Sequence, residues 1–123
     1  MPNWQPNWND VRWNWGAADE ARAALCRAAD LLDSTANERS RAATEAQAEW
    51  RGLHRDRFDA ELAQMLRRAH DLANEYREAA SRIARASQRA WDEQKHRERE
   101  RVRWRREKEE EDRRREEEAR RRG

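Results

Sequence analysis

The stretch Trp50-Arg51-Gly52 decides the fold, because it separates two long segments that both show helical periodicity. Gly52 is the only glycine between Ala17 and Arg122, so the sequence predicts the bend there. On both sides of it, apolar side chains recur every three or four residues, which places them on one face of an α-helix. The sequence therefore predicts an all-α fold, an antiparallel two-helix hairpin that bends at this tripeptide.

The larger apolar residues of the two stripes are the expected packing interface between the helices. Antiparallel pairing about the bend places Leu32 near Tyr76 and Leu25 near Ile83. A lone hairpin leaves much of each stripe exposed, so we expect a second chain to complete a four-helix bundle as a homodimer or heterodimer. The interface residues predicted in this way are Leu25, Leu32, Leu62, Met65, Leu72, Tyr76 and Ile83.

Composition favours a helical protein without catalytic or metal chemistry. Charged residues make up 44% of the chain, which has only three Gly and two Pro, and this favours helix almost throughout. Cys26 is the only cysteine, so neither an intrachain disulfide nor a cysteine-based zinc site can form. The histidines do not pair at helical spacing, and no glycine-rich loop is present to hold a phosphate. We expect no enzymatic activity, no cofactor and no metal site.

The tripeptide at the midpoint of two matched helices resembles the WxG family, small helical hairpins exported by the type VII (ESX) secretion systems of actinobacteria and their relatives. Family members often carry an aromatic residue eight positions after the Trp, where this chain has Phe58. The resemblance covers residues 17–91. It implies that Trp50, Gly52 and Phe58 form a recognition surface for the secretion machinery. The residues themselves predict that the Trp50 and Phe58 rings pack together and close the end of the hairpin. This packing role and the recognition role are compatible.

The export signal of that family is altered in this chain. The family places a Tyr, followed four residues later by an acid, near the end of the second helix. Here Trp91 is followed at that spacing by Lys95, and Tyr76 is followed by Ala80. The resemblance implies either a secreted substrate or a helical partner of a secreted effector, and the altered signal favours a partner that relies on another chain's signal.

Residues 1–16 form a tryptophan-rich arm in which Pro2-Asn3-Trp4 recurs as Pro6-Asn7-Trp8. Proline and asparagine disfavour a helix here. Two interpretations of the arm stay open. It docks in a groove of another protein, or it packs on the chain's own hairpin. In the second case, we expect its last two tryptophans to cluster with Trp91 and its first two to keep more freedom. The arm tryptophans are Trp4, Trp8, Trp13 and Trp15.

Residues 17–93 are the predicted hairpin, and residues 94–123 are a charged tail with fourteen Lys or Arg and ten acidic residues. The tail carries +4 and the whole chain +2, which leaves −2 on the residues before the tail. Acids precede bases by four positions, as in Glu109 and Arg113, and this order stabilises a helix. We expect a solvent-exposed helix that continues the second helix. A nucleic-acid-binding arm is the alternative, although the interspersed acids would repel phosphate.

The resemblance implies a non-enzymatic binding protein of type VII secretion, with a WxG-like chain or a secreted effector as its partner. The alternative is a cytosolic coiled-coil scaffold or adaptor that is unrelated to secretion. The chain has neither an 18-residue apolar run nor the hydrophobic region of a signal peptide. We therefore expect it to be cytoplasmic as synthesised, to leave the cell only together with a partner, to bind no nucleic acid and to have no membrane-spanning segment.

Overall fold

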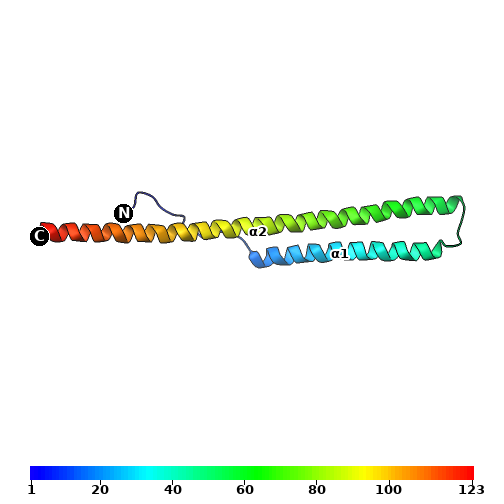
Figure 1. Ribbon diagram of the computed structural model, residues 1–123, viewed down its shortest axis with the longest axis horizontal. Coiled ribbons are helices and arrows are strands. Elements are labelled where there is room, and N and C mark those ends of the chain that lie inside the picture. Colours follow the sequence, from blue (N-terminus) through cyan, green and yellow to red (C-terminus); the bar gives the residue numbers. More distant parts are fainter. The chain divides into compact units, whose positions relative to one another are not determined.

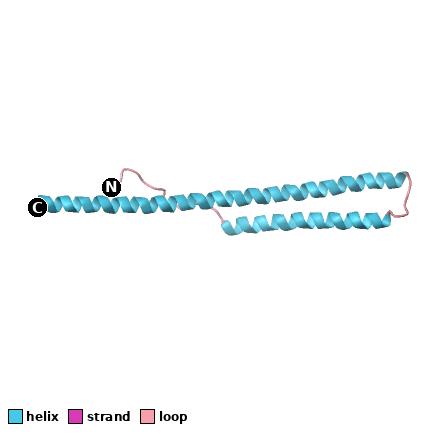
Figure 2. Cartoon of the chain, in the orientation of Figure 1, coloured by secondary structure: helices cyan, strands magenta, loops and turns pink.

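The computed structural model describes all 123 residues and contains two helices joined by a loop at residues 47–52 (Figure 1). Helix α1 spans Trp15–Ala46, and helix α2 spans Leu53–Arg122. All other residues lie in loops or turns, and there is no strand (Figure 2). The predicted all-α hairpin is confirmed.

The chain divides into two compact units. One unit is Asn14–Arg85, in which α1 and the first part of α2 form the antiparallel hairpin. The other unit joins Met1–Trp13 to Ala86–Gly123, which is the second part of α2. The segments expected as an arm and as a tail therefore lie in the same unit.

Alanines seven residues apart form the centre of the hairpin interface. Ala29 and Ala73 have 0% exposed surface, and Ala36, Ala43 and Ala80 are also buried. A spacing of seven returns a residue to the same side of the helix, facing the partner helix. Because the distance between two helix axes depends on the side chains at the contact, single methyl groups allow a close approach. We call these five alanines the alanine seam.

Polar residues at both ends of α1 fix its limits. The side chain of Asn14 accepts a hydrogen bond from the Ala17 amide at 2.9 Å, so that α1 begins two residues before its predicted start. Asn is among the favoured residues at this capping position. At the other end, the buried side chain of Gln47 donates to Asp59 of α2 at 2.5 Å. Gln47 is the C-terminal cap, and α1 ends at Ala46 instead of continuing to Trp50.

A polar cluster beside the seam joins the two helices of the hairpin. Arg77 of α2 donates to Asp30 at 3.1 Å and to Asp33 at 2.5 Å. The Nδ1 atom of His70 lies 2.7 Å from the Asp33 carboxylate. Hydrogen bonds from Arg77, and then from His70, lower the pKa of Asp33. These contacts agree with the antiparallel register that the sequence predicts, to within about one to two helical turns.

Gly52 ends the loop in a conformation that favours glycine, with φ at +114°. Its carbonyl accepts a hydrogen bond from the Asp56 amide at 3.2 Å, which starts the first turn of α2. The bend therefore lies where the sequence predicts it, and its physical requirement is the backbone angle at this residue.

We expect Gly52→Ala to lower the free energy of unfolding by about 1–2 kcal/mol, because an alanine is strained at positive φ. A Cβ atom at Gly52 would meet no atom within 4 Å, so the cost comes from the backbone alone. Gly16→Ala, inside α1, is the control and should stabilise the chain by up to about 1 kcal/mol. Thermal melts measure both changes, and effects of the same sign would contradict the role of Gly52.

Candidate functional site

Trp50 and Phe58 form an aromatic pair beside the bend. Their ring centroids lie 5.5 Å apart, with an interplanar angle of 52°. The two residues are 40% and 39% exposed. Arg55 holds the loop in place by donating to the Trp50 carbonyl at 2.6 Å. The two side chains pack on each other and still present aromatic surface to solvent.

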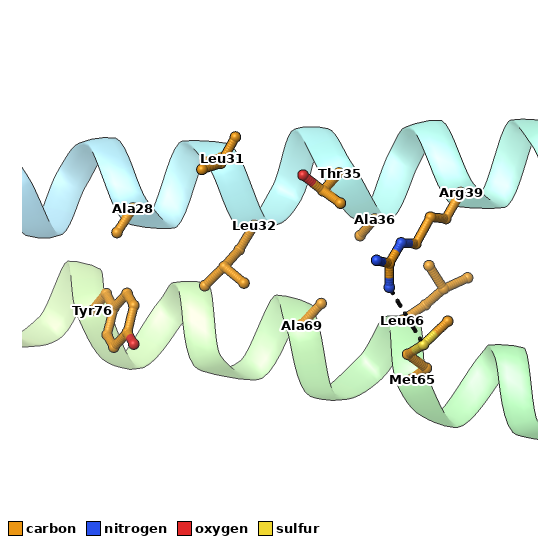
Figure 3. Close-up of a pocket in the computed structure, with 10 residues that line it drawn as sticks. All are labelled: Ala28, Leu31, Leu32, Thr35, Ala36, Arg39, Met65, Leu66, Ala69 and Tyr76. Carbon is orange, nitrogen blue, oxygen red and sulfur yellow. Dashed lines mark hydrogen bonds between the residues drawn. The ribbon is translucent and has the colours of Figure 1, made fainter.

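An open apolar groove of about 420 Å³ runs along one side of the hairpin (Figure 3). Leu32 and Ala69 point into it from opposite helices, and Arg39 lies at one end with a guanidinium nitrogen 3.7 Å from the Met65 sulfur. Leu31, at its edge, is 67% exposed. The residues that line the groove are Ala28, Leu31, Leu32, Thr35, Ala36, Arg39, Met65, Leu66, Ala69 and Tyr76.

The seven residues predicted as the packing interface lie beside the alanine seam rather than in its centre. Met65 and Leu72 are exposed. The other five are half-buried, namely Leu25, Leu32, Leu62, Tyr76 and Ile83. Three of the seven line the groove, one from α1 and two from α2. The hairpin by itself therefore leaves apolar surface accessible on both helices.

Trp91 and Lys95 lie one turn apart on an exposed part of α2. The Lys95 ammonium group is 5.2 Å from the centre of the Trp91 ring and 3.2 Å from the Glu98 carboxylate. The ammonium group therefore contacts both the aromatic face and the carboxylate. A fixed positive charge therefore stands where the WxG export signal has an acid.

The arm, defined here by the residues of its compact unit as Met1–Trp13, runs along α2 in the opposite chain direction (Figure 1). The Trp4 indole donates to Glu107 at 2.6 Å, and the Trp13 indole donates to Ser87 at 3.0 Å. Between these two tryptophans an extended chain covers about 30 Å. Their partners on α2 are separated by a similar distance, about 30 Å at 1.5 Å per residue. The equal lengths let the arm follow one face of the helix.

The arm packs on its own chain, but the surface it uses is the second part of α2 and not the hairpin. Trp4 and Trp8 were expected to keep more freedom, and this expectation is wrong. Trp8 packs edge-on against Trp104, with ring centroids 5.3 Å apart at 90°, and the Trp104 indole donates to the Trp4 carbonyl at 2.9 Å. Trp104 provides a buried partner for both residues, which composition alone does not indicate.

The expected aromatic cluster around Trp91 does not form with Trp13. The ring pairs of the structure are Trp8 with Trp104 and Trp50 with Phe58. The Trp13 indole instead satisfies its N–H by donating to Ser87, since a hydroxyl oxygen is an acceptor and an indole ring edge is not. Trp15 belongs to the other unit, where it is the first residue of α1.

Donor side chains on one face of α2 bind the main chain of the arm. Arg101 donates to the carbonyls of Asn7 and Asn9 at 2.9 and 2.8 Å, and Trp104 donates to the carbonyl of Trp4. Because the arm has no helix or strand, these donors, and not secondary structure, provide the protein partners of its carbonyl groups. We call this surface the arm-binding face. It consists of Gln94, which accepts a hydrogen bond from the Val11 amide, and of the donors Arg97, Arg101 and Trp104.

The sequence predictions did not include the arm-binding face, because its mostly polar members were interpreted as a solvated helix. The signal that identifies them is their spacing. Gln94, Arg97, Arg101 and Trp104 follow one another at steps of three, four and three, which places four hydrogen-bond donors on one side of a helix. A tryptophan among charged residues is a second indication that this side is covered.

Two carboxylates at the contact between the arm and α2 have lowered pKa values. Asp10 accepts hydrogen bonds from Gln94 at 3.0 Å and from Arg101 at 2.9 Å, and these bonds lower the pKa of Asp10. The hydrogen bond from the Trp4 indole, aided by Arg103, lowers the pKa of Glu107. Docking of the arm therefore favours the ionised form of both groups.

We expect the arm to leave α2 on acidification. Since both pKa values are lower when the arm is docked, the stabilisation is complete above the free carboxylate pKa of about 4 and is lost as the pH falls through the docked values. Tryptophan emission followed from about pH 7 to about pH 2 should show the release of the arm. Asp10→Asn should weaken the response, and an emission spectrum that does not change below pH 4 would contradict the prediction.

The last features to place are candidate metal ligands, the single cysteine and possible membrane spans. No group of three or more His, Cys, Asp and Glu side chains is placed to hold a metal ion, and Cys26 is a half-buried free thiol. Neither helix contains a stretch that is long and apolar enough to cross a membrane. No protein-family model, curated protein or solved structure matches the chain.

Proposed function

We propose that the chain is a non-enzymatic helical hairpin of type VII secretion, which binds another WxG-like chain or a secreted effector. The observation that carries this proposal is the apolar surface that the hairpin leaves uncovered, together with the exposed aromatic pair at its bend. Trp50, Gly52 and Phe58 occupy the positions that the WxG resemblance assigns to the recognition surface. The helical hairpin itself is the architecture of that family.

The groove supports pairing with a second helical chain. Burying apolar surface contributes about 25 cal/mol per Å², and the exposed Leu31 and Met65 lie along the groove together with the half-buried Leu32 and Tyr76. Two amphipathic helices laid over these residues would complete a four-helix bundle. A homodimer and a heterodimer both satisfy this requirement.

The altered export region supports the role of a partner that depends on another chain. Lys95 carries the charge opposite to the acid of the family signal, so a receptor site built for an acid would repel it. In the proposed complex, the other chain supplies the Tyr-and-acid signal, and this chain supplies the bend with Trp50 and Gly52. The chain then acts as an adaptor or as a co-secreted subunit.

Expression with a functioning type VII system tests the proposal. The chain alone should stay in the cell, and it should reach the culture supernatant only with a WxG-like partner that carries the complete signal. Trp50→Ala should abolish co-secretion. Because Trp50 is partly exposed, the variant should lose only about 1–2 kcal/mol of stability and remain folded. Trp91→Ala is the matched control and should leave co-secretion unchanged.

Three results would argue against this proposal. Detection of the chain alone in the supernatant, without markers of cell lysis, would show that its own second helix provides a sufficient signal. A stable monomer in sedimentation experiments that binds no WxG-like chain would instead favour the cytosolic coiled-coil scaffold. Trp91→Ala abolishing export as well would show that the altered signal is still used.

A further inference from the structure

We propose that the arm-binding face of α2 is a peptide-recognition site, filled by the chain's own arm and able to bind the arm of a second copy once its own arm is released. Its ligand is an extended peptide with two tryptophans four residues apart and free main-chain carbonyls around them. The site lies outside the hairpin groove, and it does not depend on the proposed role in secretion.

Arg101 is the centre of the site. Its guanidinium group donates to the carbonyls of Asn7 and Asn9 and to the carboxylate of Asp10 at 2.9 Å. Hydrogen bonds from a charged donor are roughly twice as strong as neutral ones, and the planar guanidinium can serve several acceptors at once. Contacts to main-chain carbonyls require an extended peptide but no particular side chain, so they supply affinity rather than sequence preference.

The repeated tryptophans of the arm supply the sequence preference. The guanidinium group of Arg103 lies 4.6 Å from the centre of the Trp4 ring, and that of Arg105 lies 5.5 Å from the Trp8 ring. Tryptophan is the aromatic residue that binds a cation most strongly through its face. Trp8 also packs against Trp104, and the Trp4 indole donates to Glu107, so the tryptophan of each Pro-Asn-Trp unit is anchored on α2.

The contacts between the arm and α2 are those expected of a peptide ligand bound to a preformed helix. Trp104 is the only large side chain of the contact that is buried, at 8% exposed, whereas Trp8 is 45% exposed. The arm has no secondary structure of its own and is linked to the hairpin only through Asn14. This tether gives the arm a high effective concentration, so the site stays filled within one chain. An arm from a second copy would make the same contacts, as in domain swapping.

A labelled synthetic peptide of residues 1–13 tests the site in the full chain by fluorescence anisotropy. The wild-type chain should bind it weakly, because its own arm competes. A full chain with Trp4→Ala and Trp8→Ala, the released chain, should bind the same peptide saturably and with at least about tenfold higher affinity. A peptide in which both tryptophans are replaced by alanine should not bind.

Matched arginine substitutions test whether the peptide binds at the arm-binding face. Arg101→Ala in the released chain should lower peptide affinity by at least about tenfold, since it removes several charged hydrogen bonds. Arg99→Ala removes an exposed arginine that makes no hydrogen bond with the arm, and it should leave the affinity unchanged. Helical circular dichroism verifies that each variant is folded. Equal losses from the two substitutions, or no saturable binding by the released chain, would overturn the proposal.

Complementation between two full chains tests the exchange of arms. The released chain has a free site and a weakened arm, whereas the Arg101→Ala chain has an intact arm and a weakened site. Mixing them at concentrations where the peptide binds should give a complex in sedimentation that neither chain forms alone. Absence of this added complex would overturn the binding of a second copy.

Discussion

Ala73→Leu should destabilise the hairpin more than any substitution on its outer faces, with an expected loss of about 2–3 kcal/mol in the free energy of unfolding. Ala73 lies in the alanine seam with 0% exposed surface. A leucine there adds three carbon atoms at a fully buried position of the interface. Because protein interiors are close-packed, the helices must separate or the new side chain must adopt a strained rotamer.

Ala60→Leu is the matched control for this prediction, since Ala60 is an exposed alanine of the hairpin on the same helix. Its effect should lie within about 0.5 kcal/mol, as for most surface substitutions. Urea unfolding followed by far-UV circular dichroism gives both values. Similar losses for the two variants would show that the seam is not the centre of the interface.

Trp104→Ala should release the arm almost completely and leave the stability of the hairpin unchanged. Trp104 packs against Trp8 and donates to the Trp4 carbonyl, so one substitution removes both contacts. Truncating a buried aromatic residue costs about 3–5 kcal/mol, which is more than an arm without its own core can be expected to tolerate. The hairpin should be unaffected, because the alanine seam belongs to the other compact unit.

Hydrogen exchange at the Val11 amide reports the docking of the arm, since this amide donates to Gln94 at 2.8 Å. In Trp104→Ala its exchange should rise to the rate of an unstructured peptide, while the amides of α1 keep their protection. Trp91→Ala, at an exposed tryptophan of the same helix, should leave Val11 protected. Continued protection of Val11 in Trp104→Ala would show that the arginine contacts hold the arm alone.

The hairpin could be predicted from the sequence because its causes are local. Apolar residues at steps of three and four determine each helix, and helical hydrogen bonds join residues only four positions apart. The bend needs a residue that accepts positive φ, and Gly52 is the only interior candidate. These features do not require knowledge of distant contacts.

The centre of the hairpin interface was decided only by tertiary packing. Leu25 and Ala29 both lie on the inner side of α1, and periodicity assigns them the same role. Which of the two residues lies at the centre of the interface depends on how closely the two helices approach each other. The alanines fill the seam, and Leu25 and Leu32 are left half-buried at its edges, where Leu32 lines the groove.

The contact between the arm and α2 also depends on tertiary structure alone. It joins residues as distant as Trp4 and Glu107, and no periodicity relates them. From the sequence alone, the arm is interpreted as an irregular segment and the second part of α2 as a solvated helix. The sequence determined that the arm would be extended and that the tail would be helical. Only the folded chain determined that the carbonyl groups of one would meet the donors of the other, because hydrogen-bond pairing depends on position in space and not on composition.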